Sequence, residues 1–278
     1  MDGFVSPSPD IAFRPFAAEH LDAAVALSTA VGWSHRREDW EMLFTFSCGV
    51  AALHNDRVVG TALRADFGEA VSTINMIIVE EAMRSRGLGR ALMTAALGTD
   101  TRSLRLIATI EGQPLYHKLG FETVEKLACV TGIVKTIGQP TGVRDARSQD
   151  LAQVIALESA SFGSDRSALI KWLDKNTRMA VIVRNDRVTG FAARRRFGHG
   201  HVIGPVVAQN TDDGMSLVAY LAEGLEGQLL RVDVPEASGL QRGLSEMGLE
   251  VEYLAPIMQR GPITSTSDRL AFVSQALI

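Results

Sequence analysis

The stretch IIVEEAMRSRGLGRAL, residues 77–92, decides how the rest of the chain is interpreted. Three apolar residues typical of a buried strand run into a short polar loop, and a helix is expected to open at Gly87 and Gly89. The first amides of a helix have no partner within it, and they lie at the positive end of the helix dipole. Glycine lets an anion approach those amides closely. The stretch therefore predicts a site for phosphate or pyrophosphate.

Other glycine-rich phosphate motifs fit this stretch less well. A P-loop is excluded because no Lys-Ser or Lys-Thr pair follows the glycines. A dinucleotide-binding fingerprint fits poorly, since Leu92 stands where its third glycine is required. Arg84, Arg86 and Arg90 add positive charge at the same end of the helix. The alternative interpretation is an ordinary helix that has glycines in its first turn and basic side chains facing solvent.

Outward from this stretch, the chain contains an internal repeat at an offset of 130 residues. NDRVVG at residues 55–60 recurs as NDRVTG at residues 185–190. Between residues 14 and 68, 17 of 55 ungapped positions are identical to their counterparts, whereas about three would match by chance at residue frequencies of roughly 5–7%. The boundary is expected at GQPTG, residues 138–142. This predicts two domains, residues 1–138 and 139–278.

The first copy combines strands and helices in alternation. Expected strands cover residues 11–14, 49–54, 58–64, 71–79, 104–109 and 123–134. Expected helices cover residues 19–30, 38–44, 84–97 and 114–119. The first strands form an antiparallel hairpin and the later ones alternate with helices. The expected fold class is therefore α/β (α+β), in which each domain is a mixed, largely antiparallel sheet flanked by helices.

Composition limits the class of protein. The chain has 278 residues, 46% of them hydrophobic, and a net charge of −4, so it can bury real cores and is not a basic nucleic-acid binder. Two cysteines cannot build a disulfide framework, which favours a reducing compartment. Neither a secretory signal at residues 1–7 nor a membrane span is expected. These observations predict a cytoplasmic protein without nucleic-acid or membrane partners.

A second motif, QPLYHKLGFE at residues 113–122, follows the glycine turn. Residues 84–89 look like the (Gln/Arg)-x-x-Gly-x-(Gly/Ala) signature of the GCN5-related N-acetyltransferase (GNAT) superfamily, and residues 115–121 look like its Leu-Tyr-x-x-Leu-Gly-Phe segment. Both motifs stand in the family's order and context. The resemblance covers about residues 11–135 directly and the second copy through the repeat. The chain most resembles tandem GNAT proteins with a degenerate C-terminal domain.

The resemblance implies an acetyl-CoA site between the strand at 71–79 and the strand at 104–109. A bulge in the first strand would free an N–H to polarise the thioester carbonyl. Tyr116 would protonate the departing thiolate, for which a neutral phenol is suited. The implied cofactor-binding residues are Ile77, Ile78, Val79, Arg84, Ser85, Arg86, Gly87, Leu88, Gly89, Arg90, Thr109 and Tyr116. The implied site contains no metal.

The acceptor site departs from the family pattern. Thr109 stands where many members carry Asn, and Thr73 and Asn75 stand where some carry a glutamate base. An acceptor ammonium must lose a proton, so the candidates for a base are His35, Glu111 and Asp66, and none is assigned. Trp33 and Trp40 either line an aromatic acceptor pocket or pack in the core. The candidate acceptor residues are Trp33, His35, Asn75 and Glu111.

The second copy lacks the cofactor features. When residues 206–208 are aligned with 77–79, Asp213 replaces Arg84 and both glycines of the turn are lost, and Leu244 replaces Tyr116. A non-catalytic domain that stabilises the first copy and lines its acceptor site is expected. Residues 194–196, three arginines, are predicted to lie on a solvated edge strand, with an acidic acceptor or the CoA 3′-phosphate as the alternative ligand. The tail from Gly261 is expected to pack on the body or serve an oligomer.

Together these features predict direct transfer of an acetyl group from acetyl-CoA to a primary amine of a small molecule or peptide, without a covalent enzyme intermediate. Cys129 is kept as an alternative candidate, as a nucleophile that would form a covalent intermediate. The alternative is a non-catalytic acyl-CoA-binding or regulatory module. A homodimer is compatible with the sequence. The acceptor, the general base and the preferred acyl length are not identified by it.

Overall fold

The computed structural model describes residues 10–98, 101–136, 138, 140–262 and 268–278. The first half contains β1 (Ile11–Pro15), α1 (Leu21–Ala30), α2 (Arg37–Phe46), β2 (Ser47–His54), β3 (Arg57–Phe67), β4 (Val71–Val79), α3 (Leu88–Leu97), β5 (Ser103–Ile107), α4 (Gln113–Lys118) and β6 (Glu122–Ile133). Gln139, at the expected domain boundary, lies outside the described residues, as do residues 1–7 and most of the Ser/Thr-rich start of the tail.

The second half repeats this order of elements. It contains β7 (Val143–Asp145), α5 (Leu151–Phe162), α6 (Ser167–Asn176), β8 (Arg178–Arg184), β9 (Arg187–Phe197), β10 (Gly200–Ala208), α7 (Thr211–Ala222), β11 (Leu229–Pro235), α8 (Gln241–Glu246), β12 (Glu250–Arg260) and β13 (Arg269–Ala271). The two hairpin turns have the same geometry, with φ values of 50° and 60° at Asn55 and Asp56 and again at Asn185 and Asp186. Positive φ at both central residues is typical of a type I′ hairpin. The duplication in sequence is therefore a duplication in structure.

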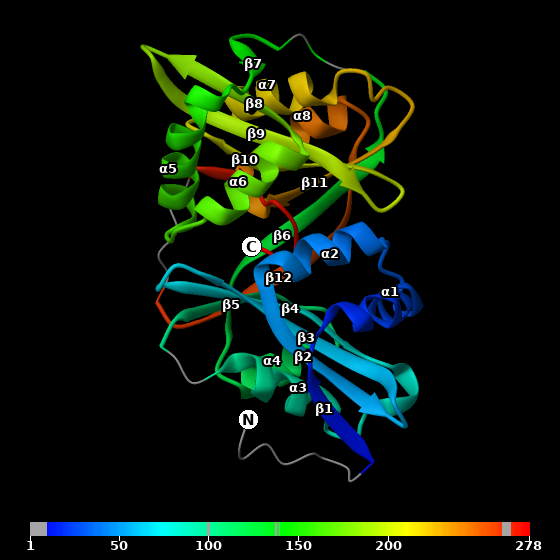
Figure 1. Cartoon of the computed structure of the whole chain (residues 1–278). Coiled ribbons are helices and arrows are strands. Elements are labelled where there is room, and N and C mark those ends of the chain that lie inside the picture. The colour runs from blue at the N-terminus through cyan, green and yellow to red at the C-terminus, as the bar shows by residue number, and fades with distance from the viewer. Residues whose placement is uncertain (1–9, 99–100, 137, 139, 263–267) are drawn as a thin grey trace.

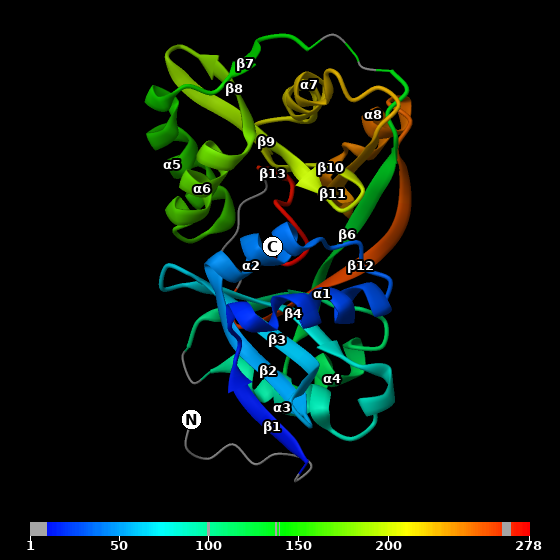
Figure 2. The same ribbon diagram turned by 45° about the vertical axis from the view of Figure 1, so that its right-hand side comes forward.

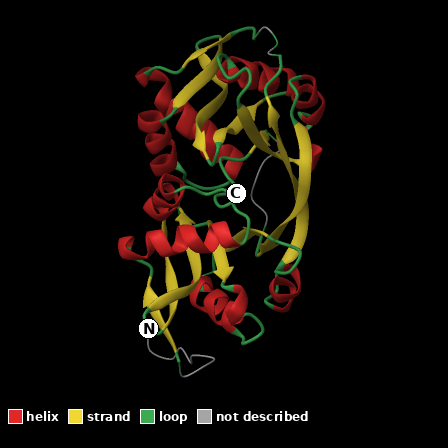
Figure 3. Ribbon diagram, turned by 90° about the vertical axis from the view of Figure 1, so that its right-hand side faces the viewer, coloured by secondary structure: helices red, strands yellow, loops and turns green. Residues whose placement is uncertain are grey.

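The strands form one sheet that runs through both halves, in the order β1-β2-β3-β4-β5-β12-β6-β11-β10-β9-β8-β7, and β13 pairs with β10. The last long strand of each half lies in the sheet of the other half. β12 pairs with β5 of the first half, and β6 pairs with β11 of the second. Figures 1 and 3 show β6 and β12 running side by side from one half into the other. The fold class is confirmed, and the exchange of strands is a feature that the sequence did not indicate.

Apolar side chains join the halves. A single hydrophobic cluster contains residues of α1 and α2 together with residues of α5 and α6, and Phe46 of α2 meets Trp172 of α6 with ring centroids 6.1 Å apart. The C-terminal residues Val273 and Leu277 belong to the same cluster, and the C-terminus lies between the halves in Figure 2. Two further cores lie under α3 and α4 and under α7 and α8. None of the described helices is long and apolar enough to cross a membrane.

Two local predictions were wrong. The helix expected over residues 84–97 begins at Leu88, because Ser85 and Gly87 adopt φ values of 63° and 78°, which a helix cannot contain. The arginine run at 194–196 does not lie on an edge strand, since β9 pairs with both β8 and β10. Arg195 is buried and forms an ion pair with Asp39 of the first half.

Candidate active site

Strands β4 and β5 separate along their length and open a cleft. They pair in parallel only from Val71–Ser103 to Thr73–Arg105. Beyond this point β4 keeps its pairing with β3 on one edge, whereas no strand of the described residues pairs with its other edge. Backbone groups of residues 77–79 on that edge are therefore available to an extended ligand, as in strand addition.

A bulge lies at the mouth of this cleft. Leu63 pairs with Asn75 and Thr61 pairs with Ile78, so that Met76 and Ile77 together face Ala62. Met76 has a φ of 50°, which is unusual for a residue other than glycine. The Thr61 hydroxyl donates a hydrogen bond of 2.7 Å to the Met76 carbonyl and so supports the bulge. A bulge turns backbone groups out of the ladder, as the family resemblance implies.

The glycine turn before α3 lies open to solvent. Arg84, Arg86 and Arg90 are exposed. The first hydrogen bond of the helix runs from the Ala91 N–H to the Gly87 carbonyl at 3.1 Å, so the amides of residues 87–90 have no partner within the helix. A Cβ at Gly89 would meet only ordinary contacts, the nearest being Leu115 at 3.7 Å. The turn thus fits a pyrophosphate, since it offers amides without partners in the helix and positive charge at the same end.

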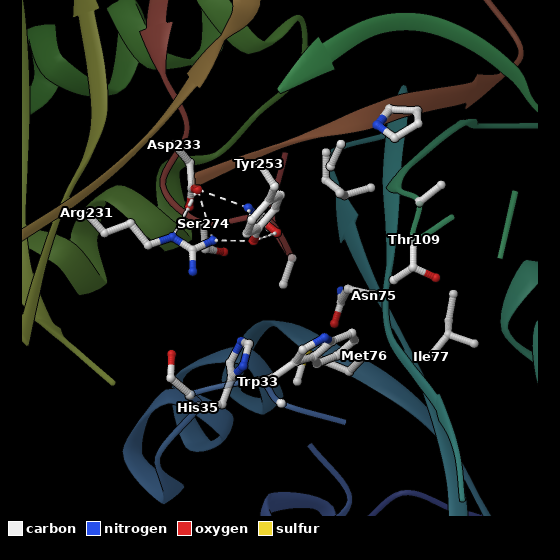
Figure 4. A pocket seen from close by; sticks show the side chains of 18 of the residues that line it. Trp33, His35, Asn75, Met76, Ile77, Thr109, Arg231, Asp233, Tyr253 and Ser274 are labelled. Atoms are coloured by element: carbon white, nitrogen blue, oxygen red, sulfur yellow. Dashed lines mark hydrogen bonds and ion pairs between the residues drawn. The ribbon is translucent and has the colours of Figure 1, made fainter. Parts of the chain in front are cut away.

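A cavity of about 560 Å³ continues from the cleft into the space between the halves. Both halves line it, as Figure 4 shows. All four candidate acceptor residues (Trp33, His35, Asn75 and Glu111) are among its lining residues, as are Ile77, Thr109 and Tyr116. The structure therefore brings residues from four separate stretches of the first half to one space.

Tyr116 of α4 lies at the cleft with its side chain nearly buried. Gly112 leaves room for the ring, since a Cβ there would lie 2.8 Å from Tyr116 Cε2. Burial raises the pKa of Tyr116 to about 12. The phenol is consequently protonated at neutral pH, the form in which it can donate a proton.

Asn75 directly precedes the bulge and points into the cavity (Figure 4). Its side chain is 5% exposed, and neither atom of its amide has a hydrogen-bond partner in the part of the chain that the structure describes. A buried polar group without partners costs free energy in the absence of a ligand. Asn75 thus presents to the cavity a buried amide whose hydrogen-bonding capacity is unused by the described residues.

Trp33 and His35 lie in the loop between α1 and α2. Their rings are 5.8 Å apart, and the His35 ring meets Phe197 of the second half edge to face at 5.2 Å. Burial is the largest influence on His35 and lowers its pKa to about 4. The imidazole is therefore neutral at neutral pH. Trp40 lies in the core instead, where its indole donates to Ser28 at 3.1 Å.

The remaining candidates differ in how they meet the cleft. Glu111 is exposed at the rim, and the Thr109 hydroxyl accepts a hydrogen bond from the Gly112 amide. The side chains of Ile78 and Leu88 pack in hydrophobic cores, so they could meet a cofactor only through their backbone. Asp66 is not among the residues lining the cavity and accepts hydrogen bonds from Arg64 and Ser72.

The second half supplies a polar cluster that sequence reasoning missed. Arg231 and Asp233 of β11 form an ion pair of 2.9 Å. Gln275 of the tail donates to Asp233 at 3.0 Å and to the Tyr253 hydroxyl at 2.9 Å. Arg231 and Asp233 alternate with buried Leu230, Val232 and Val234. That period of two signals a polar face on β11, but it does not say that the face lines a cavity of the other half.

The corresponding cleft of the second half is filled by the chain's own tail. β13 pairs with β10, and the Phe272 N–H donates to the Asp233 carbonyl of β11 at 2.8 Å. The turn before the helix is also missing, since only residues 209–210 separate β10 from α7, whereas residues 80–87 separate β4 from α3. The ungapped alignment of Asp213 with Arg84 was therefore wrong. Asn210 caps α7, and Asp213 in the first turn of that helix forms an ion pair with Arg184.

Comparisons with known proteins agree with this architecture. Residues 46–123 and residues 154–272 each match a family described as acetyltransferase (GNAT) domain. A Bacillus subtilis (strain 168) protein described as the uncharacterized N-acetyltransferase YitH is 32% identical over 222 residues, which cover 76% of this chain and 78% of that protein.

Solved structures share the fold over nearly the whole chain. A putative acetyltransferase from Pyrococcus horikoshii has a TM-score of 0.80 at 18% identity, covering 97% of this chain and 96% of the other. A tandem GNAT protein from the clavulanic acid biosynthesis pathway has a TM-score of 0.61 at 15% identity, covering 91% and 99%. GNAT domains generally use acetyl-CoA as co-substrate. From its two matched domains and its relative in B. subtilis, the chain belongs to the GNAT family, as an acyltransferase with two GNAT domains in tandem.

Proposed function

We propose that this protein transfers the acetyl group of acetyl-CoA directly to a primary amine bound in the cavity between its halves. The observation that carries the proposal is the continuity of the two spaces. The cleft that opens beyond Thr73 and Arg105 leads past the Met76 bulge into the cavity lined by Asn75 and Tyr116. A donor in the cleft and an acceptor in the cavity would thus meet beside the bulge.

The residues of the first half would hold acetyl-CoA in three places. The amides of residues 87–90, with the nearby Arg84, Arg86 and Arg90, would bind the pyrophosphate. Backbone groups of Ile77 and Val79 on the open edge of β4 would pair with the pantetheine amides. The bound cofactor supplies an acetyl group activated as a thioester. A backbone N–H turned out at the bulge would stabilise the charge that develops on the carbonyl oxygen.

Proton transfers fall to groups that the cavity already contains. Tyr116, neutral because burial raises its pKa to about 12, would return a proton to the departing thiolate. His35 and Glu111 line the cavity and are the candidates for accepting the amine proton, directly or through water. Asp66 is a poor candidate, because it does not line the cavity and Arg64 and Ser72 bind its carboxylate.

Direct transfer is supported by the state of the buried cysteine. Cys129 on β6 is buried, and burial, with a further contribution from Asp233, raises the pKa of its thiol to about 12. The thiolate is the nucleophilic form, and it is scarce at neutral pH when the pKa is this high. A covalent acetyl-cysteine intermediate is accordingly disfavoured.

The experiment that tests the proposal combines binding with turnover. Acetyl-CoA is expected to raise the Tm of the wild type, and Gly87→Asp is expected to abolish that shift, because Asp places negative charge at the turn and is strained at a φ of 78°. Asn210→Ala, at the matching helix start of the second half, serves as the control. It is expected to lower the Tm modestly through loss of the cap and to keep the shift.

Turnover is followed by thiol release with a panel of primary amines. Release that depends on both the amine and acetyl-CoA supports direct transfer, whereas trapping of acetylated protein before an amine is added contradicts it. A wild type whose Tm does not respond to acetyl-CoA contradicts the proposed site altogether. Binding without turnover on any amine would instead favour a non-catalytic acyl-CoA-binding module.

A further inference from the structure

The wall that the second half contributes to the cavity carries a guanidinium whose donors are only partly used. Arg231 Nε and Nη2 face the Asp233 carboxylate at distances of 2.9–3.1 Å, and Nη2 also lies 3.4 Å from the Tyr253 hydroxyl. Within the described residues, Nη1 makes no hydrogen bond. Figure 4 shows this nitrogen directed away from Asp233, into the space on the side of His35.

Asp233 offers little to a ligand, although it lines the same cavity. Its carboxylate is 2% exposed and accepts from Arg231 and from the Gln275 amide. Burial is the largest single influence on Arg231 and lowers its pKa, but the charge and hydrogen bond of Asp233 together with its other neighbours outweigh burial, so the pKa of the guanidinium is raised. The group that Arg231 turns toward the cavity is therefore a charged N–H donor.

Among the described residues, Asp233 is the one acid that forms an ion pair with Arg231, and it faces Nε and Nη2 rather than Nη1. His35, across from it, is neutral because burial lowers its pKa to about 4. Arg195 also lines the cavity, and it is paired with Asp39 and donates to the carbonyls of Arg196 and Val273. The cavity's other acids, Glu111 and Glu252, are exposed, so their charge is screened by water.

The ring of Phe197 lies beside the guanidinium of Arg231. Its centroid lies 5.2 Å from Arg231 Cζ and 5.3 Å from Arg195 Cζ. A ring at this distance attracts the cation, and the planar guanidinium directs its N–H donors outward in its own plane, where a planar oxyanion binds. The outward edge of Arg231 is therefore preorganised for a carboxylate.

We propose that the acceptor is an amine that also carries a carboxylate, such as an amino acid or a short peptide, and that Arg231 binds the carboxylate while the amine faces the cleft. This inference rests on the proposed acetyl transfer, because it names the substrate class of the same site. Asn75, with two unpartnered polar atoms beside the bulge, would bind the acceptor nearer the reacting amine. Arg231 thus acts as a specificity-determining residue supplied by the half without an open cofactor cleft.

Matched acceptors test the proposal without any variant. Glycine, β-alanine, γ-aminobutyrate and a set of L-amino acids are each compared with their carboxamides, which keep the amine and lose the charge. A hydrogen bond to a charged group contributes about 1.5–3 kcal/mol, so kcat/KM is expected to be about 10-fold to 150-fold higher for the acid than for its amide. The chain length that gives the largest ratio reports the distance between the two groups. Amides that react as well as the acids overturn the proposal.

Variants of Arg231 assign the preference to this residue. Arg231→Lys keeps the charge beside Asp233 but loses the planar fork, and the acid-to-amide ratio is expected to fall toward one, chiefly through KM. Because a lone change next to buried Asp233 could impair folding, the neutral pair Arg231→Gln with Asp233→Asn is the second variant, with the same expectation. Arg242→Ala, in an exposed pair with Glu246, is the control and should keep the wild-type ratio. A ratio that survives in both Arg231 variants overturns the proposal.

Failure of this inference can be told from failure of the proposed function. If acetyl-CoA raises the Tm and neutral amines are acetylated without preference for acids, the function stands and the carboxylate inference falls. If acetyl-CoA neither binds nor supports turnover, the proposed function falls. Binding of the amino acids is then measured directly by calorimetry, and the absence of an acid-over-amide difference overturns the inference as well.

Discussion

The two clefts of this protein differ in what occupies the space between their diverging strands. In the first half, β4 and β5 part after Thr73 and the space beyond them is a cavity. In the second half, β10 and β11 pair only through residues 201–202 and 230–231, and β13 lies between them farther on. A Cβ on Gly204 would lie 2.0 Å from the Phe272 carbonyl oxygen, which shows how closely the tail fits.

This difference shows that the same repeated unit occurs once with an open cleft and once with a filled cleft. A tail strand satisfies the backbone groups of β10 that an open cleft leaves to a ligand. In the filled half, a segment of the chain itself therefore occupies the place that a ligand could take in the open half. The β11 strand and the tail of the filled half then supply Arg231, Asp233 and Gln275 to the cavity of the open half.

The largest expected effect comes from removing the phenol that only the open cleft has. Leu244 stands at the position of Tyr116 in the second half and is fully buried in its core. Tyr116→Phe is expected to lower kcat by about 100-fold to 10,000-fold, since that is the usual contribution of a positioned acid. The acetyl-CoA-dependent rise in Tm should persist. Thiol-release kinetics at saturating acetyl-CoA measure the effect, and a variant with normal kcat would remove Tyr116 as the acid.

The next effect concerns how the second cleft is held closed. Glu158 is fully buried and pairs with Arg166 and with Arg269 of β13 at 2.9 and 3.1 Å. Glu158→Gln leaves these guanidiniums without a buried counter-charge, which is expected to cost about 3–5 kcal/mol of unfolding free energy. Urea unfolding measures the loss. Glu246→Gln, in an exposed pair with Arg242, is the control and should change stability by less than about 0.5 kcal/mol.

A matched pair of alanine substitutions sharpens the comparison. Asn75 and Gly204 are equivalent, because the residues before them pair with Arg64 and Arg194, which are related by the repeat. Gly204→Ala is expected to destabilise the fold by about 1–3 kcal/mol, since its Cβ would overlap Phe272. Asn75→Ala is expected to leave stability within about 1 kcal/mol and to lower activity. Equal losses of stability in the two variants, by urea unfolding, would contradict the assignment of one open and one filled cleft.

The last prediction is a pH dependence at His35, whose effect is small over any single pH unit. Its pKa is lowered from 6.5 to about 4 in the folded protein, so the unfolded chain binds its proton more readily. The stability that His35 contributes is complete above about pH 6.5 and is lost as the pH falls toward 4, with a slope of at most about 1.4 kcal/mol per pH unit. His35→Gln should flatten this part of the profile in urea unfolding at several pH values. An unchanged slope would show that the ring is not buried.

Local signals in the sequence predicted most elements of the fold. The strand at 71–79 was predicted with the bounds that it has, because an apolar run between turn residues identifies a buried strand. The start of α3 was misplaced because residue types alone do not report the positive φ values at Ser85 and Gly87. The exchange of β6 and β12 could not be predicted, since it depends on which strand edges meet after the two halves have folded against each other.

Sequence reasoning identified those candidate-site residues that lie in a continuous motif. It missed those that reach the cavity only because the two halves fold against each other. Gly87 and Tyr116 lie in short stretches whose residue types carry the chemistry. Arg231 and Gln275 belong to a half that looks inactive by its own motifs, and Asn75 becomes notable only through the partners that it lacks. A cavity that both halves line leaves no recognisable motif in the sequence of either half.

The exchanged strands β6 and β12 mean that neither half is a complete building block. Cut at the linker, each fragment would carry a strand that belongs in its neighbour's sheet and would lack one of its own. Two such fragments would be expected to recover their structure only by recombining, as subunits of a heterodimer do. The polypeptide thus has the design of an intertwined dimer whose subunits are joined end to end.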